Sequence, residues 1–158
     1  MANTQSMCTS FLGQLLTATH NFGASPVRGA ATADTFKAAL YFASATLNAS
    51  TTVYSNVGEV TGTNYGSGGI NVPNANAPDA ANTSITAGTG YWTPSAALTW
   101  TSVTITTAFD TVLIYNSTQG NKAVSVHTFG SQTISAGNIT IVMPDPAAAT
   151  ALLRLTTT

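Results

Sequence analysis

Few residues in this chain are of the types that carry out catalysis. It has one cysteine, Cys8, two histidines, His20 and His127, and five acidic residues. Nucleophilic catalysis needs a serine or cysteine beside a histidine that an acid orients, and the chain has no Gly-Xaa-Ser-Xaa-Gly elbow. It also has no phosphate loop, dinucleotide fingerprint or Cys/His cluster. The sequence therefore predicts no catalytic residues, no cofactor and no metal site, and it argues against an enzyme.

Each titratable residue has a plain structural explanation. Cys8 has no second cysteine to pair with and is expected to be a small buried residue. His20 follows a predicted helix and is expected to lie at its C-terminal dipole, whereas His127 is expected to pack or pair within a sheet. Glu59 is expected to be solvated or paired with one base. Three aspartates are expected in turns or caps, namely Asp34, Asp110 and Asp145.

Aromatic residues give a stronger indication of a binding surface. Tyrosine and tryptophan are enriched at the energetic centres of protein interfaces. The candidate interface residues are Tyr65, Tyr91, Trp92 and Trp100. Trp100 falls inside a predicted strand, where a place in the core is the main alternative. The Tyr91–Trp92 pair is expected in an interface or in the core, and a sugar-stacking site is a third alternative.

Charge is scarce, because only 6 % of the residues are charged and the formal net charge is −1, against about 25 % charged residues in ordinary domains. Threonine alone occurs 29 times. Neutral polar contacts do not weaken with salt as exposed ion pairs do, so this composition favours a structural or binding protein within an assembly. The four basic residues lie far apart in sequence, which argues against nucleic-acid binding. No apolar run reaches the ~18 residues of a membrane helix, so no membrane partner is expected.

The length of 158 residues predicts a single domain, 1–158. Apolar residues at near-helical spacing predict one N-terminal helix over 8–22. Residues 35–42 alternate in polarity and predict a strand with one buried face. Residues 57–95 are rich in Gly and Asn and predict an extended arm or a long loop, with weak strands near 59–65 and 69–72.

The remainder predicts a β-rich core of residues 96–158 together with 35–56. Separate short strands are expected over 98–107, 111–116, 122–129, 138–144 and 151–155. A turn over 117–121 joins the second and third of these as a hairpin, and a further short strand and turn are expected over 130–138. Seven to nine short strands in all predict a mainly β fold, an antiparallel β-sandwich or jelly-roll-like domain with one N-terminal helix.

Several stretches carry a resemblance to a known group. They are SFLGQLLTATHNF, DTFKAALYFASATLNASTTVYS, EVTGTNYGSGG, TVLIYNSTQGNKAVSVHTFG and AGNITIVMPDP. Together, over about residues 8–144, they resemble small virion proteins of tailed bacteriophages, and the chain is most similar to capsid cement or decoration proteins. The resemblance implies a jelly-roll-like homotrimer on the outer capsid surface that binds the major capsid protein and braces capsomer junctions. It implies no functional residue, because the group has no catalytic motif.

Two other classes of protein remain open. A tail or baseplate component, such as an adaptor or short fibre, would suit a β domain of this size. A glycan- or receptor-binding module would use the Tyr91–Trp92 pair. For the cement protein, the 57–95 segment or the N-terminal segment is expected to reach the capsid or a neighbouring subunit, and a trimer would gain affinity from simultaneous attachment.

Overall fold

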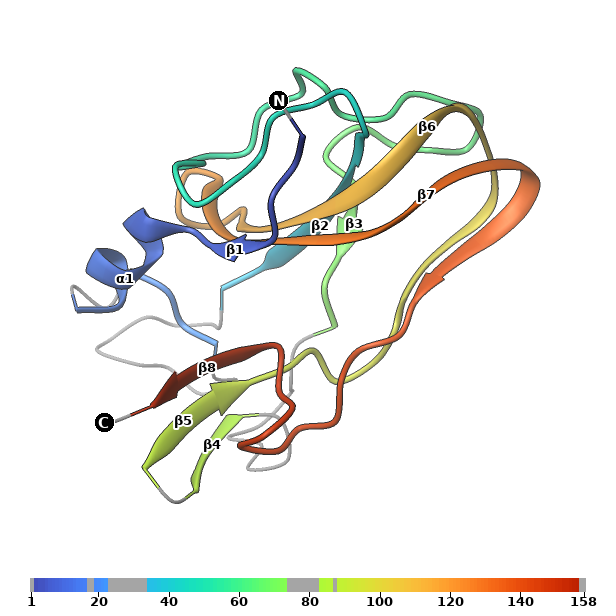
Figure 1. Ribbon diagram of the computed structural model, residues 1–158. Coiled ribbons are helices and arrows are strands. Elements are labelled where there is room, and N and C mark those ends of the chain that lie inside the picture. The colour runs from blue at the N-terminus through green and yellow to red at the C-terminus, as the bar shows by residue number, and fades with distance from the viewer. Residues whose placement is uncertain (1, 17–18, 23–33, 74–82, 87, 157–158) are drawn as a thin grey trace.

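Two antiparallel sheets form the framework of the protein in the computed structural model, which describes residues 2–16, 19–22, 34–73, 83–86 and 88–156 (Figure 1). The first sheet has the order β1-β7-β6-β2-β3, with bounds Ser6–Met7, Lys122–Ile141, Leu98–Asn116, Phe36–Phe42 and Ile70–Asn71. The second has the order β4-β5-β8, with bounds Thr83–Thr86, Thr89–Trp92 and Leu153–Thr156. The described helix is α1, Thr9–Leu16. The prediction of a mainly β fold with a short helix near the N-terminus is confirmed.

Strand β2 agrees with its predicted bounds but is buried on both faces. Phe36, Ala38 and Leu40 lie on one face, as their alternation predicts. Ala39 and Tyr41, on the other face, are also fully buried. β2 lies between β6 and β3, and the Tyr41 hydroxyl donates to the carbonyl of Ser55 in the segment that follows the strand. A strand packed from both sides reads as a nearly continuous apolar run.

Strands β6 and β7 are far longer than the short strands predicted for this region. β6 has 19 residues and β7 has 20, and they pair along their whole length, from Leu98↔Ile141 to Asn116↔Lys122. The hairpin between the predicted strands 111–116 and 122–129 is confirmed. Residues 98–107 and 138–141 do lie in strands, as predicted. They are not separate strands, and the predicted turn within 130–138 is wrong, because the ladder continues through several register shifts.

The helix is shorter than the predicted 8–22. It ends at Leu16, and the described residues 19–22 are not helical. His20 and Phe22 both lie against Phe36, with ring centroids 6.2 and 4.4 Å away. Residues two apart do not share a face of a helix, so this double contact requires a non-helical backbone. The predicted residues 17 and 18 lie outside the described part.

Residues 57–73, the first part of the predicted arm, form a loop that is packed on the first sheet. Thr63 exchanges two backbone hydrogen bonds with Thr104 of β6, and β3 pairs with β2. Gly69 has φ +68°, and a Cβ there would lie 1.8 Å from the Ala38 carbonyl oxygen, so this close backbone approach requires glycine. For these residues the long-loop alternative holds and the extended arm does not, while 74–82 lie outside the described residues. Further along the predicted 57–95 segment, Thr83–Thr86 and Thr89–Trp92 form strands β4 and β5, so neither alternative holds there.

Aromatic rings join the two sheets. Trp92 of β5 is 3 % exposed and lies 5.8 Å from Phe36 of β2, measured between ring centroids. Phe22 lies between them, 4.4 Å from Phe36 and 4.7 Å from Trp92. Burial of rings of this size is a major source of core stability. The second sheet is therefore packed against the end of β2.

Candidate interaction surface

The β6–β7 ribbon bends sharply beyond the part that pairs with β2, and several register shifts, two of them at bulges with positive φ, accompany the bend (Figure 1). Ser102 and Ala136 have φ of 52° and 48°, values that non-glycine residues seldom adopt. The Ser102 amide donates to Asn138 Oδ1 and the Ala136 amide to Thr104 Oγ1, each at 2.9 Å. Side chains thus replace ladder partners at both bulges. Such bulges increase the twist and bend of a ribbon.

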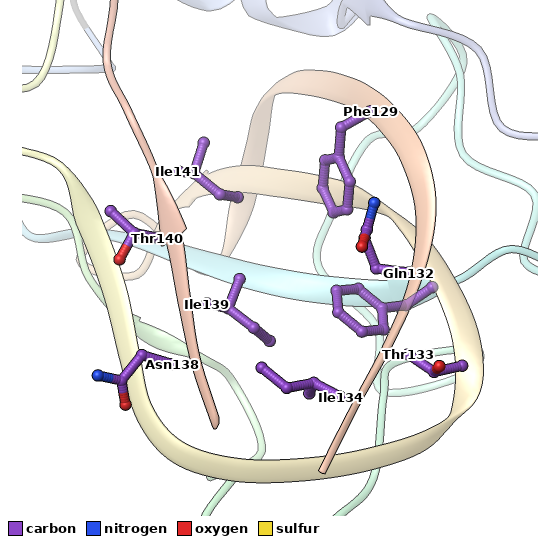
Figure 2. Close-up of a pocket in the computed structure, with 9 residues that line it drawn as sticks. Phe129, Gln132, Thr133, Ile134, Asn138, Ile139, Thr140 and Ile141 are labelled. Atoms are coloured by element: carbon purple, nitrogen blue, oxygen red, sulfur yellow. The ribbon is translucent and has the colours of Figure 1, made fainter. Parts of the chain in front are cut away.

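The bend encloses a hollow of about 400 Å³. Figure 2 shows Phe129 and Ile134 pointing into it from one limb of β7, and Ile139 and Ile141 from the other. The ring of Phe109, from β6, meets that of Phe129 edge-on, with centroids 5.9 Å apart. The lining residues are Phe109, Phe129, Gln132, Thr133, Ile134, Asn138, Ile139, Thr140 and Ile141. The hollow therefore has an apolar floor and a neutral polar rim.

No charged side chain lines this hollow. Indeed residues 123–144 contain no Asp, Glu, Lys or Arg at all. The hollow can therefore bind a partner by burying apolar surface inside it and by forming hydrogen bonds between neutral groups at its rim. Elsewhere in the described ranges, no three His, Cys, Asp or Glu side chains gather as metal ligands would.

The four aromatic candidates do not form one surface. Trp92 and Trp100 are each 3 % exposed and belong to the core, so for these two residues the core alternative holds and the interface alternative does not. Each side chain lies on the inward face of its β-strand, and the spacing of residues in the sequence did not distinguish this face from the outward one. The Trp100 Nε1 atom has no hydrogen-bond partner among the described residues.

Tyr91 and Tyr65 have different surroundings. Tyr91 is partly exposed and lines a small apolar crevice of about 150 Å³ between α1 and the second sheet. Tyr65 is held in place by its hydroxyl, which donates to Glu59 Oε1 and accepts from the Leu40 amide, both at 2.9 Å. Tyr65 therefore fastens the 57–73 loop to β2, whereas Tyr91 keeps exposed surface.

Glu59 is neither solvated nor paired with one base, contrary to the sequence-based expectation. It is 4 % exposed and accepts four hydrogen bonds. The donors are the hydroxyls of Tyr54, Tyr65 and Ser67 and the amide of Gly68, at 2.6–3.0 Å. Burial and the Glu59 charge raise the pKa of Tyr65 above its ordinary value. The run Glu-Val-Thr-Gly-Thr-Asn-Tyr-Gly-Ser-Gly, residues 59–68, holds Glu59 and three of its four donors.

His20 belongs to a buried polar cluster and does not cap an exposed helix end. Its Nε2 donates to Gln14 Oε1 at 2.8 Å, and its Nδ1 accepts from Asn116 Nδ2 at 3.0 Å. The Asn116 amide also donates to Asp34 Oδ2 at 2.7 Å, and Gln119 donates to Asp34 Oδ1. Burial lowers the pKa of His20 to about 4, although Asp34 acts in the opposite direction. The neutral ring therefore links α1 to the β6–β7 turn.

The other titratable residues mostly follow the expectations for them. Burial raises the pKa of the fully buried Cys8 to about 11. Burial lowers the pKa of His127 to about 4, and its Nε2 lies 2.8 Å from Ser125 Oγ within β7. The Asp145 carbonyl accepts from Ala147 and Thr150 in a turn. Asp110 differs, because it lies inside continuous β6, where its Oδ1 accepts from Asn3 and Thr111.

Comparison with known proteins gave no match: no family model, no curated protein and no solved structure is significantly similar to this chain. Among the described residues, no helix has the length and apolarity needed to cross a bilayer.

Proposed function

We propose that this protein is a structural component of a bacteriophage virion, a cement or decoration protein that binds the outer capsid surface and stabilises capsomer junctions. The observation that carries the proposal is the bent part of the β6–β7 ribbon, where residues 123–141 of β7 carry no charge and the hollow has an apolar floor and a neutral rim. Such a surface suits contact with another protein and offers nothing to a charged ligand. The resemblance of its helix, β2 and hairpin sequences to small virion proteins points the same way.

The proposed partners are the major capsid protein and further copies of this chain in a homotrimer. A trimer attached at three points gains affinity through effective concentration, even when each contact is small. Because few charges lie on the surface, binding to purified capsids is expected to change little between about 50 mM and about 500 mM salt. An affinity that falls steeply with salt would contradict an uncharged contact.

The two sheets are proposed to be the layers of an irregular sandwich or jelly-roll-like domain. The ring contacts of Phe22, Phe36 and Trp92 support this arrangement, because they join β2 in one sheet to β5 in the other. An experimental structure in which the β4-β5-β8 sheet leaves this aromatic cluster would contradict it.

The test of function is the copy number of the protein in purified virions, measured by quantitative mass spectrometry against the major capsid protein. Hundreds of copies near a simple ratio to the capsid protein are expected for a cement protein. A handful per particle would instead assign it to the tail or baseplate. Absence from virions would refute the structural role altogether.

A further inference from the structure

The outer edge of β7 is the longest unpaired strand edge in the described part of the chain. β1 pairs with it only at Ser125 and Val126, and β6 occupies its other side. Residues 127–141 therefore present one edge of backbone N–H and C=O groups with no strand beside it among the described residues. The outer strands of the two sheets are otherwise short, with two residues in β1 and β3 and four in β4 and β8.

This edge lacks most of the features that keep exposed strands apart. Proteins protect their edges with shortness, lysines, prolines or bulges. Between Lys122 and Pro144 there is no charged residue and no proline. The bulge at Ala136 divides the edge into two limbs, and a second register shift, between Thr128 and Gln132, interrupts the first of them. Such an edge is a template for a strand from another molecule.

Apolar side chains border the edge along both limbs. Phe129, Ile134, Ile139 and Ile141 are partly buried and face the hollow (Figure 2). Val142, immediately after the strand, is 79 % exposed. At about 3.3 Å per residue, the 15 residues of this edge follow a path of about 50 Å along the chain.

The absence of charge along this edge restricts the kind of partner that can bind it. An occupant that brought charged side chains to this edge would bury them without a counter-charge, which is costly. The occupant must therefore be neutral over a similar length. This chain itself supplies such a surface, since residues 123–144 are uncharged and His127, with its pKa lowered by burial, is neutral at pH 7. Two copies that meet here bring no like charges together.

We propose that the outer edge of β7, residues 127–141, together with the hollow beside it, is the surface through which one copy of this chain binds a second copy. The inference rests on the proposed function, for which it names the partner of this surface. Strand pairing supplies the backbone hydrogen bonds, and the row of isoleucines and Phe129 supplies the apolar contact.

The test is the mass of the purified full chain in solution, measured by light scattering between about 1 and about 100 µM. The wild type is expected to form an oligomer whose mass is at least twice the 16.1 kDa of one chain. Ile139→Lys and Thr133→Lys place a cation at the edge, and each is expected to weaken association at least about tenfold. Thr106→Lys, at an exposed threonine of β6, is the matched control and is expected to associate as the wild type does.

A wild type that stays at 16.1 kDa at the highest concentration would overturn the proposal, and so would an oligomer that neither edge lysine weakens. Hydrogen exchange on the wild type tests the same point without a variant, because association must slow the exchange of amides within 127–141. Unchanged exchange there would overturn it as well. If the protein is a monomer and still binds capsids through this edge, the partner of the edge is the capsid protein. That result would refute self-pairing and leave the proposed function intact.

Discussion

Acid is expected to destabilise this protein through His20, and the structure sets the size of the effect. The neutral ring donates through Nε2 to Gln14 and accepts through Nδ1 from the Asn116 amide. A proton on Nδ1 would face the N–H of Asn116, so two donors would oppose each other. Burial lowers the folded-state pKa to about 4, from an ordinary value of 6.5; the nearby Lys122 charge acts in the same direction and Asp34 opposes both.

The sign follows from proton binding. Between pH 6.5 and pH 4 the unfolded chain binds a proton at His20 and the folded chain does not, so stability falls as the pH falls through this window. The contribution is complete above pH 6.5. From pH 7.5 to pH 5 the loss from His20 alone is about 2 kcal/mol, since one pKa unit corresponds to about 1.4 kcal/mol. For a chain of this length that lowers the melting temperature by about 4–8 °C.

The assay is urea unfolding of wild type, His20→Gln and His127→Gln at a series of pH values and constant ionic strength. Glutamine at position 20 can still donate to Gln14 but does not titrate. We expect His20→Gln to be less stable at pH 7.5 and to lose about 2 kcal/mol less than the wild type on going to pH 5. His127 also has a lowered pKa, so the His127→Gln variant shows how much of the pH dependence comes from that histidine instead. If His20→Gln keeps the wild-type pH slope, the buried-histidine argument is refuted.

Three further predictions concern the packed loop and the thiol. Glu59→Gln replaces an oxygen that accepts hydrogen bonds with an NH₂ group facing hydroxyl or amide donors, and urea unfolding is expected to show a loss of about 2–3 kcal/mol; an unchanged midpoint would contradict the role of Glu59 as an anchor. Gly69→Ala would place a Cβ 1.8 Å from the Ala38 carbonyl oxygen at φ +68°, whereas no heavy atom lies within 4 Å of a Cβ at Gly66. Calorimetry should show Gly69→Ala destabilised by about 4 kcal/mol or more and Gly66→Ala by less than about 1; similar losses in both would argue against the close approach. Cys8 is fully buried, with its pKa raised to about 11, so a thiol reagent should modify it only at the rate of unfolding, and rapid labelling of the native protein would contradict this burial.

Local pattern was a good guide where neighbouring residues decide the structure. The alternation in 35–42 predicted β2 almost to the residue, and the turn residues 117–121 correctly placed the β6–β7 hairpin. The helix began close to its predicted start, but its end was wrong because Phe22 and His20 pack against Phe36. That contact joins residues distant in sequence and overrides the local helical pattern.

Candidate residues were harder to place. Tyr65 and Trp92 were chosen for their type, and the structure puts the first in a hydrogen-bonded anchor and the second in the core. Glu59 gave no signal of its environment, because its acceptor role depends on a loop that returns to it. The hollow was missed altogether. The β-branched residues predicted strands there, and the bend of the ribbon around a space accompanies register shifts between β6 and β7, including the bulges at Ser102 and Ala136.

The sequence by itself determined the scarcity of charge, the mainly β character and the neutrality of residues 123–144, because composition and side-chain alternation are properties of the chain alone. Tertiary structure decided which of those neutral residues face a hollow, which aromatic rings are buried and how four donors gather around one glutamate. These outcomes depend on strand register and on bulges. A bulge of one residue moves the following side chains to the other face of a strand, and nothing in the local pattern predicts which pairing the rest of the protein will stabilise.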